Sequence, residues 1–275
     1  MTLIGRTRVR GVETLSLDAP ERRNALSAAL VGELAGALTD AAADGDVRAV
    51  VLTHTGNTFS AGADLRDPSP SPRLLPHSRL PTSGGIPTSG GTPTSGGGPN
   101  APEALTGLLR QLVELPKPVV ARVTGHVRAG GLGLLAACDI AAASHAATFA
   151  FTEVRVGVAP AVISLPLLPR TDPRALARYY LTGERIDAAE ATRIGLLTAS
   201  GDDVDDVLAP ILDGLRRAAP EALAETKRLL TARVLETFDR DAAHLTALSA
   251  RLFASAHARE GMTAFLERRD PEWVV

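Results

Sequence analysis

The 275-residue sequence has little of several features that define whole classes of proteins. Its one cysteine, Cys138, excludes a disulfide within the chain and is typical of a reducing compartment, so we expect a cytoplasmic protein. Aromatic residues make up only 3%, so a core must be built mainly from Ala, Val, Leu and Ile. No run of about 18 uncharged apolar residues is present, and residues 1–6 lack the apolar region of a signal peptide. We therefore expect no membrane association.

The sequence also has no excess of charge of one sign. Its formal net charge is −2, and acidic and basic residues are interspersed. Such a chain has no pattern that favours nucleic-acid or membrane surfaces. A hydrophobic content of 45% suffices for one sizeable core, or for a core with a helical appendage.

Strand and helix patterns alternate over the first 150 residues. The strands are predicted at 6–18 (two, broken near Gly11), 47–53, 118–124, 139–143 and 148–151, and the helices at 27–43, 104–115 and 130–137. This alternation predicts an α/β core with crossover connections.

The pattern from about residue 172 is almost wholly helical. Asp172-Pro173 is typical of a helix start, and Asp187 with Glu190 resembles a capping box. Gly195 lies where a helix would end, Pro220 can begin another, and a long helix is predicted over roughly 236–258.

The segment 67–102 interrupts the alternation. The sequence Pro-Thr-Ser-Gly-Gly repeats within it at Pro81, Pro87 and Pro93. Such a stretch has too little apolar surface to offset the entropy lost on ordering, so we predict a flexible loop.

Two short turns of glycine and alanine carry most of the chemical information. They span 60–65 (Ser-Ala-Gly-Ala-Asp-Leu) and 129–133 (Ala-Gly-Gly-Leu-Gly), after the strand-like runs 50–53 and 119–123. Turns of this kind expose backbone N–H groups to a ligand. Two N–H groups that converge on one oxygen form an oxyanion hole, although spacing alone does not prove convergence.

The residues around both turns resemble the enoyl-CoA hydratase/isomerase (crotonase) superfamily. The matching segments are 20–26, 59–65, the second glycine turn 129–133 with 137–140, 153–160 and 260–269, in the family's order. The resemblance implies an α/β crotonase-type spiral of ββα repeats over residues 1–200, with 67–102 as an insertion. It also implies a helical oligomerisation region over 201–275 that forms homotrimers, which pair into hexamers.

The resemblance also assigns roles to particular residues. It implies that the amides of Ala63 and Gly130 form an oxyanion hole for a thioester, and that Glu153 is the catalytic acid/base. Coenzyme A would be part of the substrate, with no separate cofactor and no metal. The positions implied for coenzyme A are Arg23, Ala25, Ala61, Asp64, Leu65, Arg66, Phe265 and Arg268, and those implied for the acyl pocket are Arg128, Gly131, Gly133 and Pro160.

The sequence departs from the two-glutamate hydratases at Gly133, where the first of their glutamates would align. Its motifs are closest to bacterial methylglutaconyl-CoA hydratase-like members, whose substrates bear a second carboxylate, so hydration of an enoyl-CoA is the first expectation. The alternatives are a double-bond isomerase that uses Glu153 alone and a non-catalytic acyl-CoA-binding relative. We expect the glycine to leave room beside the thioester.

Three other interpretations remain beside these. Arg128 either anchors a substrate carboxylate or coenzyme A phosphate, or is an exposed or intersubunit arginine. Cys138 is expected to be a buried apolar residue. The run 131–136 fits the dinucleotide-binding pattern G-x-G-x-x-A, but residues 125–129 separate it from the preceding predicted strand, which argues against nucleotide binding.

Overall fold

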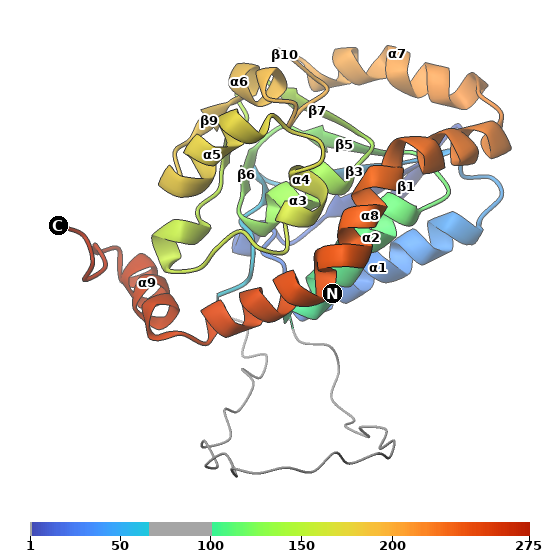
Figure 1. Cartoon of the computed structure of the whole chain (residues 1–275). Coiled ribbons are helices and arrows are strands. Elements are labelled where there is room, and N and C mark those ends of the chain that lie inside the picture. Colours follow the sequence, from blue (N-terminus) through green and yellow to red (C-terminus); the bar gives the residue numbers. More distant parts are fainter. Residues whose placement is uncertain (1, 66–100) are drawn as a thin grey trace, which may run out of the picture.

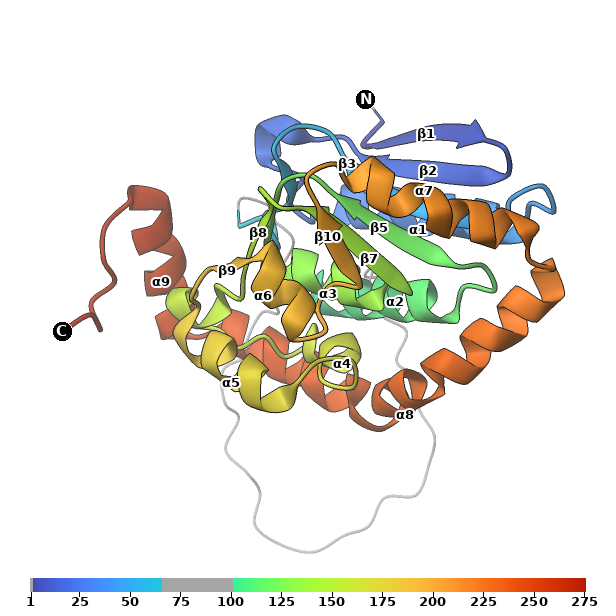
Figure 2. The same cartoon turned by 90° about the horizontal axis from the view of Figure 1, so that it is seen from above.

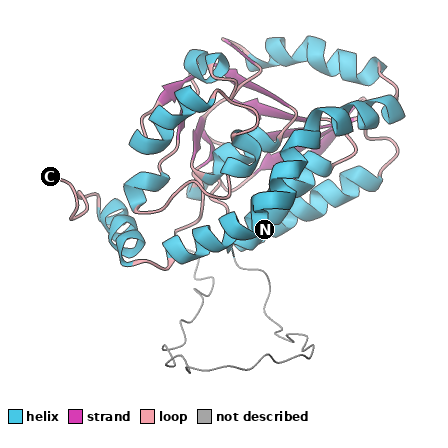
Figure 3. Ribbon diagram, viewed as in Figure 1, coloured by secondary structure: helices cyan, strands magenta, loops and turns pink. Residues whose placement is uncertain are grey.

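The computed structural model describes residues 2–65 and 101–275 (Figure 1). The segment 67–102 therefore lies outside the described residues except for Ala101 and Pro102. These two residues already belong to a helix, so the predicted loop was drawn two residues too long. Figure 3 shows helices surrounding a central group of strands.

The largest element is a six-stranded sheet in the order β1-β2-β3-β5-β7-β10. Its strands are β1 (Ile4–Val9), β2 (Val12–Leu17), β3 (Ala49–His54), β5 (Val119–Val123), β7 (Ile140–Ser144) and β10 (Ala199–Gly201). The strands β1 and β2 form an antiparallel hairpin around Gly11, and all the other neighbours are parallel. Parallel neighbours need crossovers, which the helices between them supply.

A smaller sheet has the order β4-β6-β8-β9 and lies at one end of the large one. Its strands are β4 (Thr58–Ser60), β6 (His126–Arg128), β8 (Thr148–Ala150) and β9 (Ile186–Asp187). Each of β3, β5 and β7 is thus followed by a short strand of the second sheet, which gives the repeating ββα order of a spiral. The analysis of the sequence missed β4, β6, β9 and β10, each of which has only two or three residues.

Helices cover both faces of the large sheet (Figure 2). The helices α1 (Ala28–Ala43), α2 (Ala101–Glu114) and α3 (Gly130–Ala137) lie on one face, and α7 (Val204–Arg217) lies on the other. Successive strand residues face opposite sides: Val50 and Leu52 join the main core, whereas Val51 packs under α7. Because both faces are buried, β3 has an unbroken apolar run over its first four residues, 49–52.

The C-terminal part is helical, as expected. It contains α4 (Ser164–Leu167), α5 (Pro173–Thr182), α6 (Ala188–Arg193), α8 (Pro220–Phe253) and α9 (Ala256–Glu267). Asp172 and Asp187 cap α5 and α6 as predicted. The long helix begins earlier than predicted, at Pro220, and is continuous for 34 residues. The division of the chain at residues 200/201 stays a prediction, and α7 packs on the sheet of the core.

None of the helices in residues 2–65 and 101–275 is both long and apolar enough to cross a membrane.

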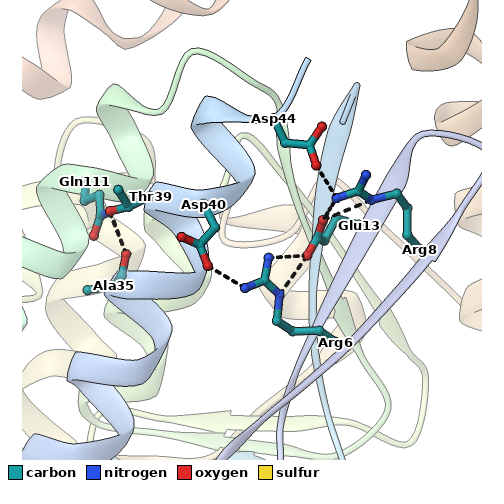
Figure 4. A network of polar contacts seen from close by, with 8 residues as sticks. All are labelled: Arg6, Arg8, Glu13, Ala35, Thr39, Asp40, Asp44 and Gln111. Carbon is teal, nitrogen blue, oxygen red and sulfur yellow. Dashed lines mark hydrogen bonds and ion pairs between the residues drawn. The ribbon is translucent and has the colours of Figure 1, made fainter. Parts of the chain in front are cut away.

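A polar network fastens the first hairpin to α1 (Figure 4). Glu13 is buried, and its carboxylate accepts hydrogen bonds from both Arg6 and Arg8. The same arginines reach Asp40 at 2.7 Å and Asp44 at 2.6 Å, at the end of α1. A buried carboxylate needs such partners, because an unpaired charge inside a protein is costly.

Asn24 fixes the chain before the first glycine turn. Its side chain is fully buried, accepts a hydrogen bond from the amide of Ala19 and donates to the carbonyls of Thr55 and Thr58. It therefore holds the segment around residues 20–26 against the loop between β3 and β4, and so helps to place the turn that follows.

We predict that Asn24→Ala lowers the free energy of unfolding by about 2–4 kcal/mol, because it leaves buried backbone groups without partners. Urea denaturation measures this loss. Glu21→Ala, at an exposed position of the same segment, is the control and should change stability by less than about 0.5 kcal/mol. Equal effects of the two substitutions would contradict this account.

Candidate active site

A cavity of about 330 Å³ lies between the two glycine turns, the Glu153 segment and the ends of α2, α8 and α9. Its walls are almost entirely apolar. The only charged side chains among its described lining residues are Asp64 and Glu153. Asp64 is paired with Arg22 at 3.3 Å.

The two glycine turns lie against each other at this cavity. Gly62 has φ of +89°, and a Cβ atom placed on it would lie 3.2 Å from the amide nitrogen of Gly130. The same atom would lie 2.8 Å from Cβ of Ala129, so only glycine fits at residue 62. Contact between the turns brings Ala63 and Gly130 to the same cavity.

The start of α3 at Gly130 suits an anion, and Ala63 of the first turn lines the same cavity. Leu26 and Ala63 form an isolated β-bridge, in which the amide of Leu26 donates a hydrogen bond to the carbonyl of Gly62. Gly130 is the first residue of α3, where N–H groups have no intrahelical acceptor and the helix dipole favours negative charge. Ala129, just before it, has a positive φ of 46°, a strained conformation that is typical of functional turns.

Glu153 contributes the carboxylate of the site. It begins the 3-10 turn η2 (Glu153–Val156) and lines the cavity. Its side chain is buried, and Oε2 has no hydrogen-bond partner among the described residues. Burial raises the pKa of this carboxyl from an ordinary 4.5 to about 7, against a smaller lowering by its own backbone N–H. A carboxyl with this pKa can both accept and return a proton near neutral pH.

Helix α9 packs closely on the turn that carries Glu153. A Cβ atom on Gly157, which has φ of +77°, would lie 2.6 Å from the backbone of His257. A Cβ atom on Gly261 would lie 2.6 Å from the backbone of Val156. The two glycines therefore allow backbone-to-backbone contact that fixes η2, and the same helix supplies Met262 to the cavity.

The structure brings some of the expected site residues together and leaves others apart. Glu153, Ala63, Gly130, Asp64, Leu65 and Pro160 all line the cavity. Arg23, Ala25 and Ala61 belong to the adjoining turn, where the amide of Ala61 donates to the carbonyl of Arg23. Phe265 and Arg268 are exposed at the end of α9 and do not line the cavity. Arg66 lies outside the described residues.

Arg128 does not line the cavity either. Its guanidinium donates to the carbonyls of Val127 and Thr148 and to the hydroxyl of Thr148. Burial lowers its pKa, with a smaller lowering by the charge of Arg185. The half-buried side chain thus stabilises the end of β6 against β8, and both interpretations of its role, at a substrate anion or between subunits, stay predictions.

Gly131 and Gly133 are buried inside α3 and pack against neighbouring elements. A Cβ atom on Gly131 would lie 2.8 Å from Cβ of Ser60. A Cβ atom on Gly133 would lie 2.7 Å from Cγ2 of Ile163. The expectation that Gly133 leaves room beside the thioester is therefore wrong, because Ile163 fills that space.

The glycine pattern of 131–136 is unsuited to dinucleotide binding for a different reason from the one that the sequence indicated. Strand β6 ends at Arg128, so a strand does precede the glycine turn closely. The glycines of the pattern, however, lie within α3 and not in the strand-to-helix turn, and side chains of β4 and of Ile163 occupy the space over them. A pyrophosphate has no access to their backbone.

Several cavity residues were missed by the analysis of the sequence. They are Leu105 of α2, Ile163 of the loop before α4, Ser249 and Phe253 of α8, and Met262 of α9. Met262 lies in the segment 260–269 that resembles the family, but neither it nor the other four was assigned a role from the sequence. Cys138 is buried as expected, and burial raises the pKa of its thiol to about 12, which suits an unreactive residue.

Known proteins resemble this chain over nearly its whole length. The family model described as enoyl-CoA hydratase/isomerase matches residues 7–71 and 100–274. The crystal structure of an enoyl-CoA hydratase from Mycobacterium avium is 44% identical, covers 99% of each chain and superimposes with a TM-score of 0.82.

Two curated relatives differ in the activity that their names state. The enoyl-CoA hydratase domain-containing protein 3 of Danio rerio is 30% identical over 96% of this chain and 84% of that protein. The 1,2-epoxyphenylacetyl-CoA isomerase of Escherichia coli is 29% identical over 96% of this chain and 95% of that protein. The chain belongs to the enoyl-CoA hydratase/isomerase family, and the expected crotonase-type α/β fold is confirmed.

The packing of α9 on the Glu153 turn gives a testable prediction. Gly157→Ala should lower the free energy of unfolding by about 2–4 kcal/mol, because a side chain there meets backbone and needs a positive φ. Turnover of an acyl-CoA substrate by the folded variant should also fall at least about tenfold, because Glu153 moves.

Gly36→Ala is the matched control. It lies inside α1 with nothing within 4 Å of the added Cβ atom, so it should raise stability by up to about 1 kcal/mol and leave turnover unchanged. A Gly157→Ala variant as active and as stable as this control would show that the contact does not position Glu153.

Proposed function

We propose that this chain adds water to an α,β-unsaturated acyl-CoA thioester, with Glu153 as the proton-transferring side chain. The observation that carries the proposal is a buried carboxylate with a raised pKa and an unpartnered oxygen, in one apolar cavity with two adjoining backbone turns. These are the parts that chemistry at the carbon beside a thioester requires.

The amides of Ala63 and Gly130 would bind the thioester oxygen and stabilise the enolate charge that forms on it. One donor of this kind lowers a barrier by roughly 3 kcal/mol. The dipole of α3 adds positive potential at Gly130. Glu153 takes a proton from water as the oxygen adds to C3 and returns a proton to C2, so the carboxylate is regenerated. No separate cofactor takes part.

The charges of the cavity lining indicate what kind of acyl group it would bind. Its described lining residues include two carboxylates and no Lys, Arg or His, and Arg128 is bonded elsewhere. Among the described lining residues, a second carboxylate on the substrate would find no cation to pair with, and it would share an apolar cavity with the carboxyl of Glu153. We therefore propose an uncharged acyl group in place of the dicarboxylic group that the likeness to methylglutaconyl-CoA hydratases implies.

Double-bond isomerisation is the second candidate, and one observation favours it. The place of a second carboxylate is occupied by Gly133 with Ile163 packed over it, so no second acid holds the attacking water there. A single carboxylate suffices to move one proton between two carbons. Incubation with crotonyl-CoA and with 3-enoyl-CoA decides between the two, because hydration adds the mass of water and isomerisation changes only the double-bond position.

We predict that Glu153→Gln lowers turnover at least about 100-fold, within the usual range for loss of a general acid/base. For the parent, kcat/KM should rise with pH and level off above about 7, because the base must be ionised. Turnover assays across this pH range are the measurement. Near-parental turnover by Glu153→Gln would refute the role of Glu153 in either reaction.

The same substitution should change stability in a pH-dependent way. In the folded protein the Glu153 carboxyl has a pKa of about 7, so it binds its proton more tightly than in the unfolded chain, where the pKa is about 4.5. The parent therefore loses stability as the pH rises from about 4.5 to 7. Glu153→Gln should therefore be more stable than the parent at pH 8, by up to about 3 kcal/mol, and the gain should vanish below about pH 4.5. Urea denaturation at both pH values checks this, and a pH-independent difference would contradict a buried charge.

Affinity for saturated acyl-CoAs tests the proposed substrate class without turnover. Butyryl-CoA should bind at least about tenfold more tightly than glutaryl-CoA, because a buried unpaired carboxylate costs well over 1.4 kcal/mol. Isothermal titration calorimetry measures both dissociation constants. Equal or tighter binding of glutaryl-CoA would support a dicarboxylic substrate.

A further inference from the structure

Ile163 packs over Gly133 of α3, a contact that the sequence around Ile163 does not indicate. Its Cγ2 lies 2.7 Å, and its Cβ 3.2 Å, from where a Cβ atom of residue 133 would be. Gly133 lies one helical turn beyond Gly130, so the two residues share a face of α3. Ile163 therefore lies over that face of α3, and it lines the cavity that contains the amide of Gly130.

The wall that contains Ile163 is fixed in place. Ile163 is only 3% exposed and directly precedes α4. The hydroxyl of the next residue, Ser164, donates to the carbonyl of Pro160 at 2.7 Å and lies 3.3 Å from the hydroxyl of Tyr180. The side chain of Ser164 thus bonds back to the start of the loop 159–163. The other four residues of this loop, Ala159, Pro160, Ala161 and Val162, also line the cavity.

Leu109 of α2 closes the other side of the same contact. Its Cδ1 would lie 3.2 Å from a Cβ atom on Gly133, and it is fully buried. Ile163 consequently has α3 and α2 behind it and the cavity in front. A change in the size of residue 163 alters the width of the cavity, and an added side chain at 133 pushes Ile163 toward the substrate.

We propose that Ile163, seated over Gly133, is the specificity-determining residue of this cavity and limits the width of the acyl group next to the thioester. The proposal rests on the proposed function, since it takes the cavity to be the acyl pocket. It predicts that straight-chain acyl groups are preferred over groups branched at C3, and that the preference depends on the pair formed by residues 133 and 163.

Binding of two saturated acyl-CoAs tests this without requiring turnover. Butyryl-CoA is the straight probe and isovaleryl-CoA the branched one. The ratio of their dissociation constants, from calorimetry, should move by about tenfold in favour of isovaleryl-CoA in Ile163→Ala, the amount typical of a few methyl groups in an apolar pocket. Ile163→Val should move it in the same direction by less, and it serves if the alanine variant does not fold.

Gly133→Ala should have the opposite effect. The added methyl group displaces Ile163 into the cavity, so the affinity for isovaleryl-CoA should fall about tenfold relative to that for butyryl-CoA. The double variant Gly133→Ala/Ile163→Ala should recover the parental ratio of dissociation constants. Two independent sites with opposite effects would give the same ratio, so thermal unfolding is measured as well to show that the two residues share one space. Gly133→Ala should destabilise the parent but not the Ile163→Ala background, because neighbours that share a space are not additive.

Ile211→Ala is the control. It removes the same atoms from a partly buried isoleucine of α7, on the opposite face of the sheet, and should leave the ratio unchanged. A ratio in Ile163→Ala within about twofold of the parent would overturn the inference while leaving the proposed function intact. Failure of the parent to bind either acyl-CoA would overturn the proposed function and this inference with it.

Discussion

The contact between the two glycine turns is the constraint on which the rest of the site depends. Residues 62 and 130 are far apart in the sequence, and they meet because β4 and β6 pair in the small sheet while β3 and β5 pair in the large one. The approach is so close that Gly62 has no space for a side chain beside Ala129. A Cβ atom there would separate the two amides, so the glycines are required by the distance between the turns as well as by their curvature.

The site also depends on the burial of Glu153, which lowers the stability of the folded protein when the carboxyl is ionised. Burial that raises the pKa of a carboxyl to about 7 destabilises its ionised form, the form that acts as a base. The compensation lies in backbone contacts: α9 packs on η2 through Gly157 and Gly261, and the carbonyl of Glu153 accepts from the amide of Val158. Position is therefore fixed by the backbone, while the carboxylate oxygen Oε2 is left without a partner among the described residues. On this one short turn, backbone contacts therefore provide the stability, and the carboxylate oxygen is left available for the proposed proton transfer.

Much of the fold could be predicted from the sequence because its longer elements are locally consistent. The helix α1, for example, begins after the capping residue Ser27 and has Leu30, Val31, Leu34 and Leu38 buried on one face. Four of the five short strands, β4, β6, β9 and β10, were missed because two or three residues cannot show a period. Helix α8 was predicted in two pieces, yet no glycine or proline interrupts it after its first residue, and its contact with α2 supports it throughout its middle.

The candidate site was only partly predictable, for a related reason. Ala63, Gly130 and Glu153 lie in motifs whose resemblance to a family indicates a role, and the structure brings them to one cavity. Part of its wall comes from Ser249 and Phe253, whose sequence context is that of any helix face, and from Met262, which lies in a family-like segment but had no role assigned to it. Gly133 shows the limit most clearly: its local sequence indicates free space, whereas its surroundings are set by Ile163, thirty positions further along the chain. Which side chain fills a space is a property of tertiary packing, and no local pattern records it.

Taken together, these contacts separate what the backbone does from what the side chains do. In the proposed function the backbone supplies the anion site, through two turns and the start of α3, and it holds the Glu153 turn through α9. A fold that fixes these parts by main-chain contacts can keep them in place while the side chains that line the cavity change. In the proposed function, the outcome of the reaction and the choice of acyl group then depend on a few exchangeable positions, among them residue 163, which lines the cavity and packs over Gly133 of α3. This division explains how one family includes proteins named as hydratases and as isomerases.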